Sequence, residues 1–111
     1  MTVITTLDIK DMEPGEYRAV LDQMGVETRP AAGIYLHLTS PMSFGYRITE
    51  LWDRKEGFEE FLERRLAPAT QELRIERETE ISITPLHNLF APRLQEISGL
   101  TAGLPGAPGA R

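Results

Sequence analysis

The strongest candidate for an acid/base group in this chain is His87, one of its two histidines. It follows Pro85 near the end of a strand predicted over residues 79–90. Alternation places it on the face that carries Glu50 and Trp52, unless a bulge at Pro85 breaks the count. Because an imidazole titrates near neutral pH, it suits the oxygenation or cyclisation of an acidic phenol. The alternative is a structural histidine whose ring is hydrogen-bonded to the backbone at a strand end.

Three further candidates, Tyr46, Glu50 and Trp52, share one face of a strand predicted over residues 44–52. A buried glutamate needs a partner or a raised pKa, so Glu50 is either a catalytic base or the partner of an arginine at a subunit boundary. Trp52 either lines a cavity or packs in the core under the following helix. We predict that Glu50 and His87 are catalytic. Tyr46, Trp52 and Asn88 are predicted to bind the ligand.

Tyr35 and His37 alternate with Ile34 and Leu36 along a strand predicted over residues 33–39. We therefore expect the tyrosine and the histidine on the opposite face from the two apolar residues, where packing between subunits is the favoured role and ligand binding the alternative. Two histidines without a His-x-His pair, in a chain without cysteine, offer no paired ligand spacing. We predict no metal site.

The motifs that hold nucleotide cofactors or activate nucleophiles are missing from the sequence, which has no glycine-rich phosphate loop, no Gly-x-Ser-x-Gly elbow and no cysteine. Any enzyme of this sequence is expected to work without a cofactor. The net charge is −5 and the basic residues are scattered, so nucleic acid is not an expected partner. Because the sequence shows no signal-peptide pattern and no membrane-length apolar run, we expect a cytoplasmic protein without membrane contact.

The elements that position these candidates follow the order β-α-β-β-α-β. Strands are predicted over residues 2–9, 33–39, 44–52 and 79–90. The first helix is expected to begin at Pro14 and to end at Gly25, because proline fits the first helical position and glycine fits a left-handed cap.

The second helix is expected to begin with Asp53 as its cap and Glu56 as the other half of a capping box. Pro68 must then kink or end this helix, and it opens a short helix that reaches Leu73. Pro85 within the fourth strand favours an edge position for that strand.

This order is the split βαβ plan of an α+β ferredoxin-like fold, an antiparallel four-stranded sheet with two helices on one face. Alternation assigns to the helix-covered face Val3, Leu7, Ile9, Ile34, Leu36, Leu38, Ile48, Ile81 and Ile83. It assigns to the other face Ile4, Thr6, Tyr35, His37, Thr39, Arg47, Thr49, Leu51, Ser82, Thr84 and Leu86. Because nothing in the chain is left to cover this second face, we expect a homodimer that stacks sheet on sheet; the alternative is a monomer with a solvated face.

The chain divides at about residue 90. Residues 1–90 are expected to form the single ferredoxin-like domain. Residues 91–111 form a C-terminal tail rich in proline, glycine and alanine, which we expect to be disordered beyond about residue 100 because this composition buries little.

The segment Glu50-Leu51-Trp52-Asp53-Arg54-Lys55-Glu56-Gly57-Phe58 resembles the strand-to-helix junction Glu-x-Trp-x-Ser/Asp-x-Glu-x-Phe of the antibiotic-biosynthesis-monooxygenase-like family of dimeric α/β barrels. The segments over residues 61–69 and 85–90 are similar to those of small bacterial members, so the resemblance covers residues 2–90. It implies a dimeric barrel with a cavity between the helices and the sheet, which the equivalent of Trp52 often lines.

Members of this superfamily include cofactor-independent oxygenases of aromatic polyketides, haem-degrading monooxygenases, cyclases, dehalogenating or isomerising enzymes, and proteins without known activity. The haem-degrading members carry a histidine where this chain reads Phe61-Leu62-Glu63, so haem degradation is not expected. The resemblance and the residues together predict a small cofactor-independent enzyme, a monooxygenase or a cyclase/isomerase, acting on an aromatic or polyketide-like small molecule. Its cavity would be lined by Tyr46, Trp52 and His87. The alternative function is a non-catalytic, dimeric ligand-binding or structural module of the same fold.

Overall fold

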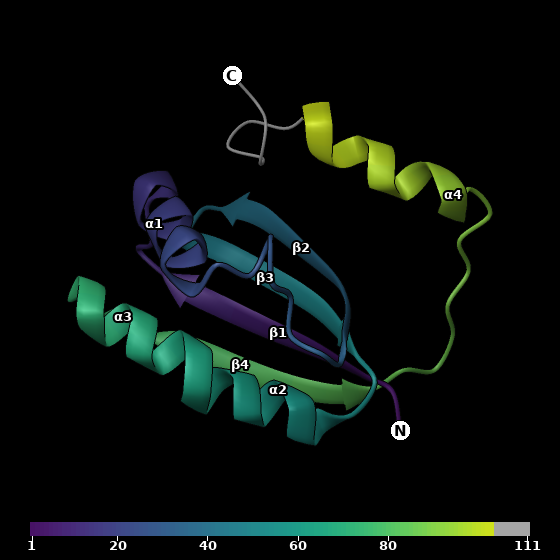
Figure 1. Ribbon diagram of the computed structural model, residues 1–111, viewed down its shortest axis with the longest axis horizontal. Coiled ribbons are helices and arrows are strands. Elements are labelled where there is room, and N and C mark those ends of the chain that lie inside the picture. The colour runs from purple at the N-terminus through teal and green to yellow at the C-terminus, as the bar shows by residue number, and fades with distance from the viewer. Residues whose placement is uncertain (104–111) are drawn as a thin grey trace.

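A computed structural model of the chain describes residues 1–103 and has the predicted ferredoxin-like α+β fold (Figure 1). The sheet has four strands in the order β2-β3-β1-β4, and every neighbouring pair is antiparallel. The strands are β1 (Val3–Lys10), β2 (Ile34–Met42), β3 (Gly45–Trp52) and β4 (Thr79–Pro85). The helices are α1 (Pro14–Met24), α2 (Lys55–Phe61), the π-helical turn η1 (Leu62–Leu66), α3 (Ala67–Leu73), α4 (Leu94–Ile97) and the 3-10 turn η2 (Ser98–Gly103).

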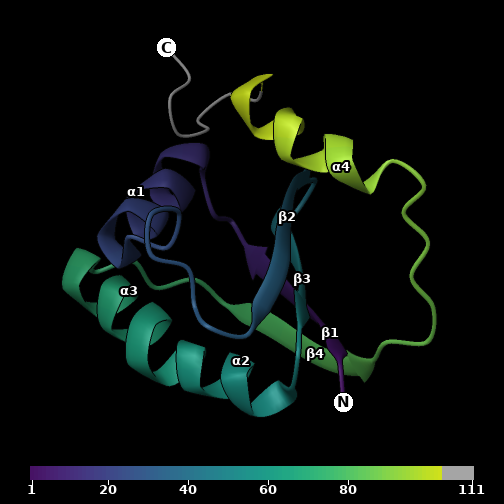
Figure 2. The ribbon, with the colours of Figure 1, turned by 45° about the vertical axis from the view of Figure 1, so that its right-hand side comes forward.

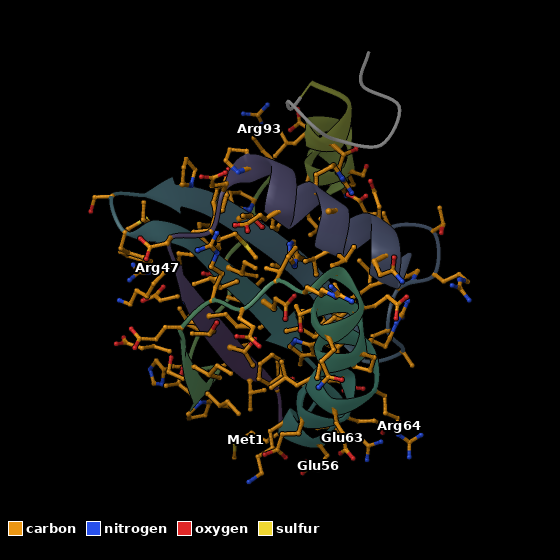
Figure 3. The ribbon with its side chains drawn as sticks, turned by 90° about the vertical axis from the view of Figure 1, so that its left-hand side faces the viewer. Met1, Arg47, Glu56, Glu63, Arg64 and Arg93 are labelled. Carbon is orange, nitrogen blue, oxygen red and sulfur yellow. The ribbon has the colours of Figure 1, made fainter. Side chains whose placement is uncertain are left out.

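The helices α1, α2 and α3 all lie on one side of the sheet (Figure 2). We call the sheet face beneath them the inner face and the opposite one the outer face. Trp52 at the end of β3 and Phe58 in α2 are both 0% exposed, and their rings meet edge to face with centroids 5.8 Å apart. On the far side of the helical layer, Glu63 and Arg64 project away from the sheet (Figure 3). The apolar stripes of the helices therefore bury a single core against the inner face.

The first helix has the predicted bounds. Pro14 occupies its first position, and the backbone N–H of Glu13 donates to Oε1 of Glu16 at 3.0 Å. Gly25 ends the helix in the left-handed conformation, with φ of 67°, and its N–H donates to the carbonyl of Leu21.

The second helix begins one residue later than predicted. Asp53 is not its cap, because its backbone N–H still donates to the carbonyl of Gly33 at 2.9 Å, as a continuation of the sheet. The residue at the cap position is Arg54, and α2 begins at Lys55. Pairing between strands thus overrides the local capping signal.

Pro68 behaves as predicted, because it separates two helical segments and the second one reaches Leu73. The turn before it is π-helical, so the N–H of Ala67 donates to the carbonyl of Leu62, five residues back. Pro68, which has no N–H, then falls in the first turn of α3, where a missing donor leaves nothing unpaired.

Strand β4 lies at an edge of the sheet, as predicted, but it ends at Pro85 rather than at residue 90. Pro85 pairs with Val3, the first residue of β1, and the N–H of Leu86 donates to the carbonyl of Thr2. Beyond this point the neighbouring strand offers no further partner, so residues 87–90 leave the sheet. The hairpin between β2 and β3 is also tighter than predicted, with only Ser43 and Phe44 between the strands.

A β-bulge in β2 overturns the predicted faces of that strand. Ile34 pairs with Trp52 but Leu36 pairs with Leu51, so Tyr35 is an extra residue without a partner. After the bulge, His37 and Thr39 lie on the inner face, where both contact Tyr17 of α1. Leu36 and Leu38, predicted for the core, lie instead on the outer face, and Leu38 is 58% exposed.

The C-terminal segment after β4 contains a short helix and a 3-10 turn over residues 94–103, part of which was predicted to be disordered. The rest of that prediction concerns residues 104–111, which lie outside the described residues. Within residues 1–103, each helix is too short or too polar to cross a membrane.

Candidate active site

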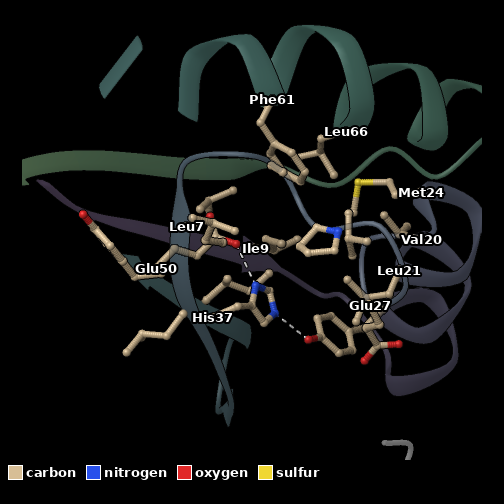
Figure 4. A pocket seen from close by; sticks show the side chains of 18 of the residues that line it. Leu7, Ile9, Val20, Leu21, Met24, Glu27, His37, Glu50, Phe61 and Leu66 are labelled. Carbon is tan, nitrogen blue, oxygen red and sulfur yellow. Dashed lines mark hydrogen bonds and ion pairs between the residues drawn. The ribbon is translucent and has the colours of Figure 1, made fainter. Parts of the chain in front are cut away.

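A cavity of about 410 Å³ lies between α1, the loop over residues 25–33, η1 and the inner face of the sheet (Figure 4). Most of its wall is apolar and includes Ile9, Val20, Met24, Ile48, Phe61 and Leu66. Its volume is within the range of small-molecule sites, which run from about 300 to 1,000 Å³. A ligand with an apolar body of a few fused rings would be desolvated on most sides.

The polar end of the cavity is formed by His37 and Glu50, which are direct neighbours across β2 and β3. Nδ1 of His37 lies 2.6 Å from Oε2 of Glu50. On the other side of the ring, Nε2 lies 2.7 Å from the hydroxyl of Tyr17 and 2.9 Å from Oγ1 of Thr39. Figure 4 shows both contacts of the imidazole, to the glutamate and to the tyrosine.

Glu50 is 4% exposed, and both of its carboxylate oxygens have partners. Oε1 accepts from the indole Nε1–H of Trp52 at 3.0 Å, and Oε2 faces the imidazole. A buried carboxyl group held in this way keeps a fixed orientation. It favours the imidazole tautomer that carries its proton on Nδ1, which leaves the lone pair of Nε2 directed toward Tyr17.

Tyr17 comes from α1 and completes the polar end. Its hydroxyl is also 2.7 Å from Oγ1 of Thr39, so these two hydroxyls and Nε2 of His37 form a small closed cluster. Its ring stacks on the imidazole with centroids 6.1 Å apart and contacts the ring of Tyr46 at 5.5 Å. Burial is the main cause that raises the pKa of the Tyr17 phenol, which therefore remains a hydrogen-bond donor at neutral pH.

The loop over residues 25–33 forms the side of the cavity nearest to solvent and is tied to the helices. The guanidinium of Arg65 in η1 donates to the carbonyl of Met24 at 2.7 Å and to the carbonyl of Arg29 at 2.8 Å. Glu27, which lines the cavity, forms an ion pair with Arg18. The described residues of the wall include the carboxylates Glu27 and Glu50 but no lysine or arginine, so a histidine is the one side chain among them that could offer a positive charge to an anionic ligand.

Of the seven predicted site residues, three line this cavity: Glu50, His37 and the largely exposed Tyr35. Trp52 and Tyr46 are not among the described residues of its wall. Trp52 holds Glu50 from behind and packs on Phe58, so it has the predicted core role, and Tyr46 supports the ring of a wall residue.

His87 and Asn88 follow the end of β4, are exposed, and are not among the described residues that line the cavity. The predicted position of His87 on the face of Glu50 and Trp52 depended on a strand that continues to residue 90. Since β4 ends at Pro85, alternation no longer places the side chain of His87.

The sequence reasoning missed the contribution of Tyr17 and Thr39. Tyr17 belongs to an apolar stripe of α1, where a phenol needs a hydrogen-bond partner, and that need was the available signal. Among residues 1–103, no three histidine, aspartate or glutamate side chains gather closely enough to hold a metal ion.

Comparison with solved structures shows that the fold is shared at low sequence identity. SnoaB, a cofactor-independent oxygenase from Streptomyces nogalater, matches with a TM-score of 0.56 at 15% identity, over 79% of this chain and 93% of SnoaB. A candidate antibiotic biosynthesis monooxygenase from Deinococcus radiodurans matches with a TM-score of 0.58 at 19% identity, over 82% of this chain and 97% of that one. The de novo designed protein Foldit4 gives 0.54 at 18% identity, over 78% of this chain and 100% of the design.

These matches confirm the resemblance seen in the sequence at the level of the fold, which this chain shares with antibiotic-biosynthesis-monooxygenase-like proteins. A comparison of the sequence with protein-family models and with curated proteins finds no match. Because a designed protein fits nearly as well as an oxygenase, the fold by itself carries no activity. Any activity has to be argued from the site.

Proposed function

We propose that this chain is a cofactor-independent enzyme that removes a proton from an acidic C–H or O–H group of a flat aromatic or polyketide-like molecule. The observation that carries the proposal is the pairing of His37 with the buried Glu50 at the polar end of an otherwise apolar cavity. The imidazole has its tautomer set from one side and presents its basic nitrogen on the other. We assign the acid/base role to His37 because His87 lies outside the wall of the cavity.

The apolar body of the ligand would lie against Ile9, Ile48 and Phe61, with its acidic group at Nε2 of His37. On accepting the proton, the imidazole becomes an imidazolium whose charge is stabilised by Glu50. The Tyr17 hydroxyl, released from Nε2, donates to the oxygen on which negative charge develops. The raised pKa of Tyr17 favours this role as a donor over a role as a base.

An electron-rich carbanion formed in this way reacts with dioxygen without help from a cofactor. The carbanion gives one electron to dioxygen, and the resulting carbon radical and superoxide combine to form a peroxide. The peroxide takes up the proton held by His37 and loses water. The methylene group plus dioxygen thus becomes a ketone plus water. SnoaB, which shares the fold, is a cofactor-independent oxygenase, and this favours oxygenation over isomerisation, in which the proton would return to a different atom.

Dithranol, a three-ring phenolic anthrone with an acidic central methylene, is a suitable probe. Under nitrogen, the enzyme is expected to accelerate exchange of the methylene protons with deuterated water, measured by NMR; in air, it should accelerate oxygen uptake with formation of the anthraquinone. His37→Gln should lower both rates by about 10²–10⁴-fold, as expected for loss of a general base. His87→Gln, at an exposed position outside the wall, is the matched control and should leave both rates unchanged.

The outcomes distinguish the proposal from its alternative. Exchange without oxygen uptake would assign the chain to the cyclase/isomerase class. Binding of dithranol can be measured by the quenching of the fluorescence of the single tryptophan. Binding without proton exchange and without oxygen uptake would identify a non-catalytic ligand-binding module and overturn the proposal.

We also propose that the chain forms a homodimer that covers the outer face of the sheet. This face combines the apolar row Ile4, Leu51 and Leu36, paired across three strands, with the exposed Leu38. A stable interface buries about 800 Å² on each partner. Sedimentation equilibrium at micromolar concentration should give twice the chain mass of 12.5 kDa, and a monomer would contradict the proposal.

A further inference from the structure

The segment after β4 exposes an unusual amount of apolar surface. We call residues 86–103 the arm. The large apolar side chains that are exposed in residues 1–103 number ten, and half of them belong to the arm. They are Leu89, Phe90, Leu94, Ile97 and Leu100, with exposed fractions of 53%, 83%, 61%, 40% and 65%. Concentration of exposed apolar residues in one segment marks an interaction surface.

The helical part of the arm has two different sides. Leu94, Ile97 and Leu100 recur every three residues and form one apolar stripe. Arg93 and Glu96 pair with each other elsewhere on the same turns, with Nη2 and Oε1 at 2.8 Å. An amphipathic segment with an exposed stripe needs a partner surface.

The arm also lies on the side of the sheet that the other helices leave open. In Figure 2, the loop that leads to α4 stands on the opposite side of the sheet from α1, α2 and α3, and α4 lies beyond the end of β2. Large apolar side chains remain exposed on both surfaces, Leu38 of the outer face by 58% and Leu94 of the arm by 61%, although Leu51 of the outer face is buried. The arm therefore leaves part of its own sheet uncovered.

The length of the connection is sufficient for the arm to reach a second copy that is stacked on the outer face. Residues 86–93 join β4 to α4, and eight extended residues reach at most about 26–29 Å. Two sheets stacked face to face lie about 10 Å apart. The connection is therefore long enough for the arm to pass the edge of a second sheet and to contact that copy.

We propose that the arm of each chain clasps a second copy of the same chain, which sits against the outer face. A second copy is favoured over a membrane surface, because helices that lie on membranes carry several lysines or arginines on their polar side, whereas Arg93 in the arm is already paired with Glu96. This contact of the arm, residues 86–103, is an addition to the homodimer proposed above.

Because the chain has no cysteine, a single introduced thiol can report on the position of the arm. Gln95→Cys, labelled with a benzophenone photocrosslinker, places the probe on the arm and leaves the apolar stripe intact. Mixing isotopically light and heavy chains before illumination allows mass spectrometry to identify crosslinks between copies. Mixed light–heavy crosslinks from the arm to the other copy are expected. The same probe at Glu60→Cys, where the side chain is 63% exposed on α2, should give none.

A second measurement tests the energetic role of the stripe. Leu94→Asp should weaken the dimer about tenfold or more in sedimentation equilibrium, since burial of an unpaired charge opposes the contact. Gln95→Asp adds the same charge to the neighbouring residue outside the stripe and should change the dimer constant less than twofold.

Each other outcome overturns the clasp. Crosslinks confined to single chains would show that the arm folds onto its own domain. A dimer that persists unchanged in Leu94→Asp, without mixed crosslinks, would leave the homodimer standing and remove the arm from it. Sedimentation with phosphatidylcholine vesicles that is abolished by Leu94→Asp, without mixed crosslinks, would assign the arm to a membrane. None of these readouts depends on enzymatic activity.

Discussion

His37 and Glu50 face each other as a direct cross-strand pair, and Nδ1 of the imidazole lies 2.6 Å from Oε2 of the carboxylate. The glutamate is buried while the side chain of the histidine is 30% exposed, so the pair leads from the core to the cavity. In the proposed function, Glu50 acts through the histidine as a positioning residue.

Glu50→Gln should reverse the tautomer of His37. An amide can keep accepting from Trp52 through its oxygen while its NH₂ group faces Nδ1, which must then be the unprotonated nitrogen. Nε2 would carry the proton and lose its basicity toward the cavity. We expect the exchange rate with dithranol to fall about 10²–10⁴-fold. Nitrogen NMR of the imidazole provides the second readout, and an unchanged tautomer with a full rate would contradict the assignment.

Tyr17 should keep its phenolic proton at pH values somewhat above 10.0, the ordinary pKa of a tyrosine, because burial raises the pKa of this phenol. The folded chain then binds a proton that the unfolded chain releases, so the free energy of unfolding should fall as the pH rises past 10. Tyrosinate absorbance of the intact chain minus that of Tyr17→Phe isolates this residue. Urea unfolding below and above that pH measures the loss of stability, which should be smaller in the variant. A difference titration centred at or below 10.0 would count against the burial argument.

Gly45 should tolerate no side chain. Its φ is 144°, and an added Cβ would lie 2.1 Å from the carbonyl oxygen of Ile9. Gly45→Ala is therefore expected to lower the free energy of unfolding by about 1–3 kcal/mol or more. At Gly15 in the first turn of α1, an added Cβ would meet no atom within 4 Å apart from its chain neighbours and the backbone of its own helix, so Gly15→Ala should instead stabilise the chain, by about 0.5–1 kcal/mol. Equal effects in urea unfolding would refute the steric account.

Arg65 should hold the loop over residues 25–33 against the cavity. Removing its two hydrogen bonds in Arg65→Met is expected to cost about 1.5–3 kcal/mol of stability and to accelerate amide hydrogen exchange in that loop. Arg64→Met is the matched control, since the side chain of Arg64 is 74% exposed and pairs with Glu60 on the same helix. Loop exchange that is unchanged in Arg65→Met would show that the loop is ordered by other contacts.

The order of elements could be predicted because its signals are local. Pro14 and Gly25 bound α1 through their own backbone preferences, and Pro85 indicated the edge strand through its missing donor. Where the prediction was wrong, a distant partner decided. Asp53 stays paired with the carbonyl of Gly33, and β4 stops where β1 has no further residue to offer.

The candidate site was less predictable for the same reason. Glu50 was identified, since its face followed from alternation in an unbroken strand. Strict alternation assigned His37 to the outer face. That assignment was wrong because one residue of β2 has no partner in β3, and a single sequence does not reveal the register between strands. Tyr17 looked like a core residue of α1 until the structure placed its hydroxyl beside the imidazole.

The bulge at Tyr35 decides which side chains of the edge strand β2 line the cavity. If β2 paired regularly from Ile34 onward, the side chain of His37 would lie on the outer face and that of Leu36 on the inner face. The polar end of the cavity would then be lined by an apolar side chain. A cavity that contains the imidazole and one that does not thus differ by a one-residue shift in the pairing of β2. Deletion of Tyr35 would leave a single arrangement, because regular pairing from Ile34 onward would then keep His37 on the inner face. A chain without this residue would place the histidine inside by regular pairing, whereas this chain places it there through the bulge.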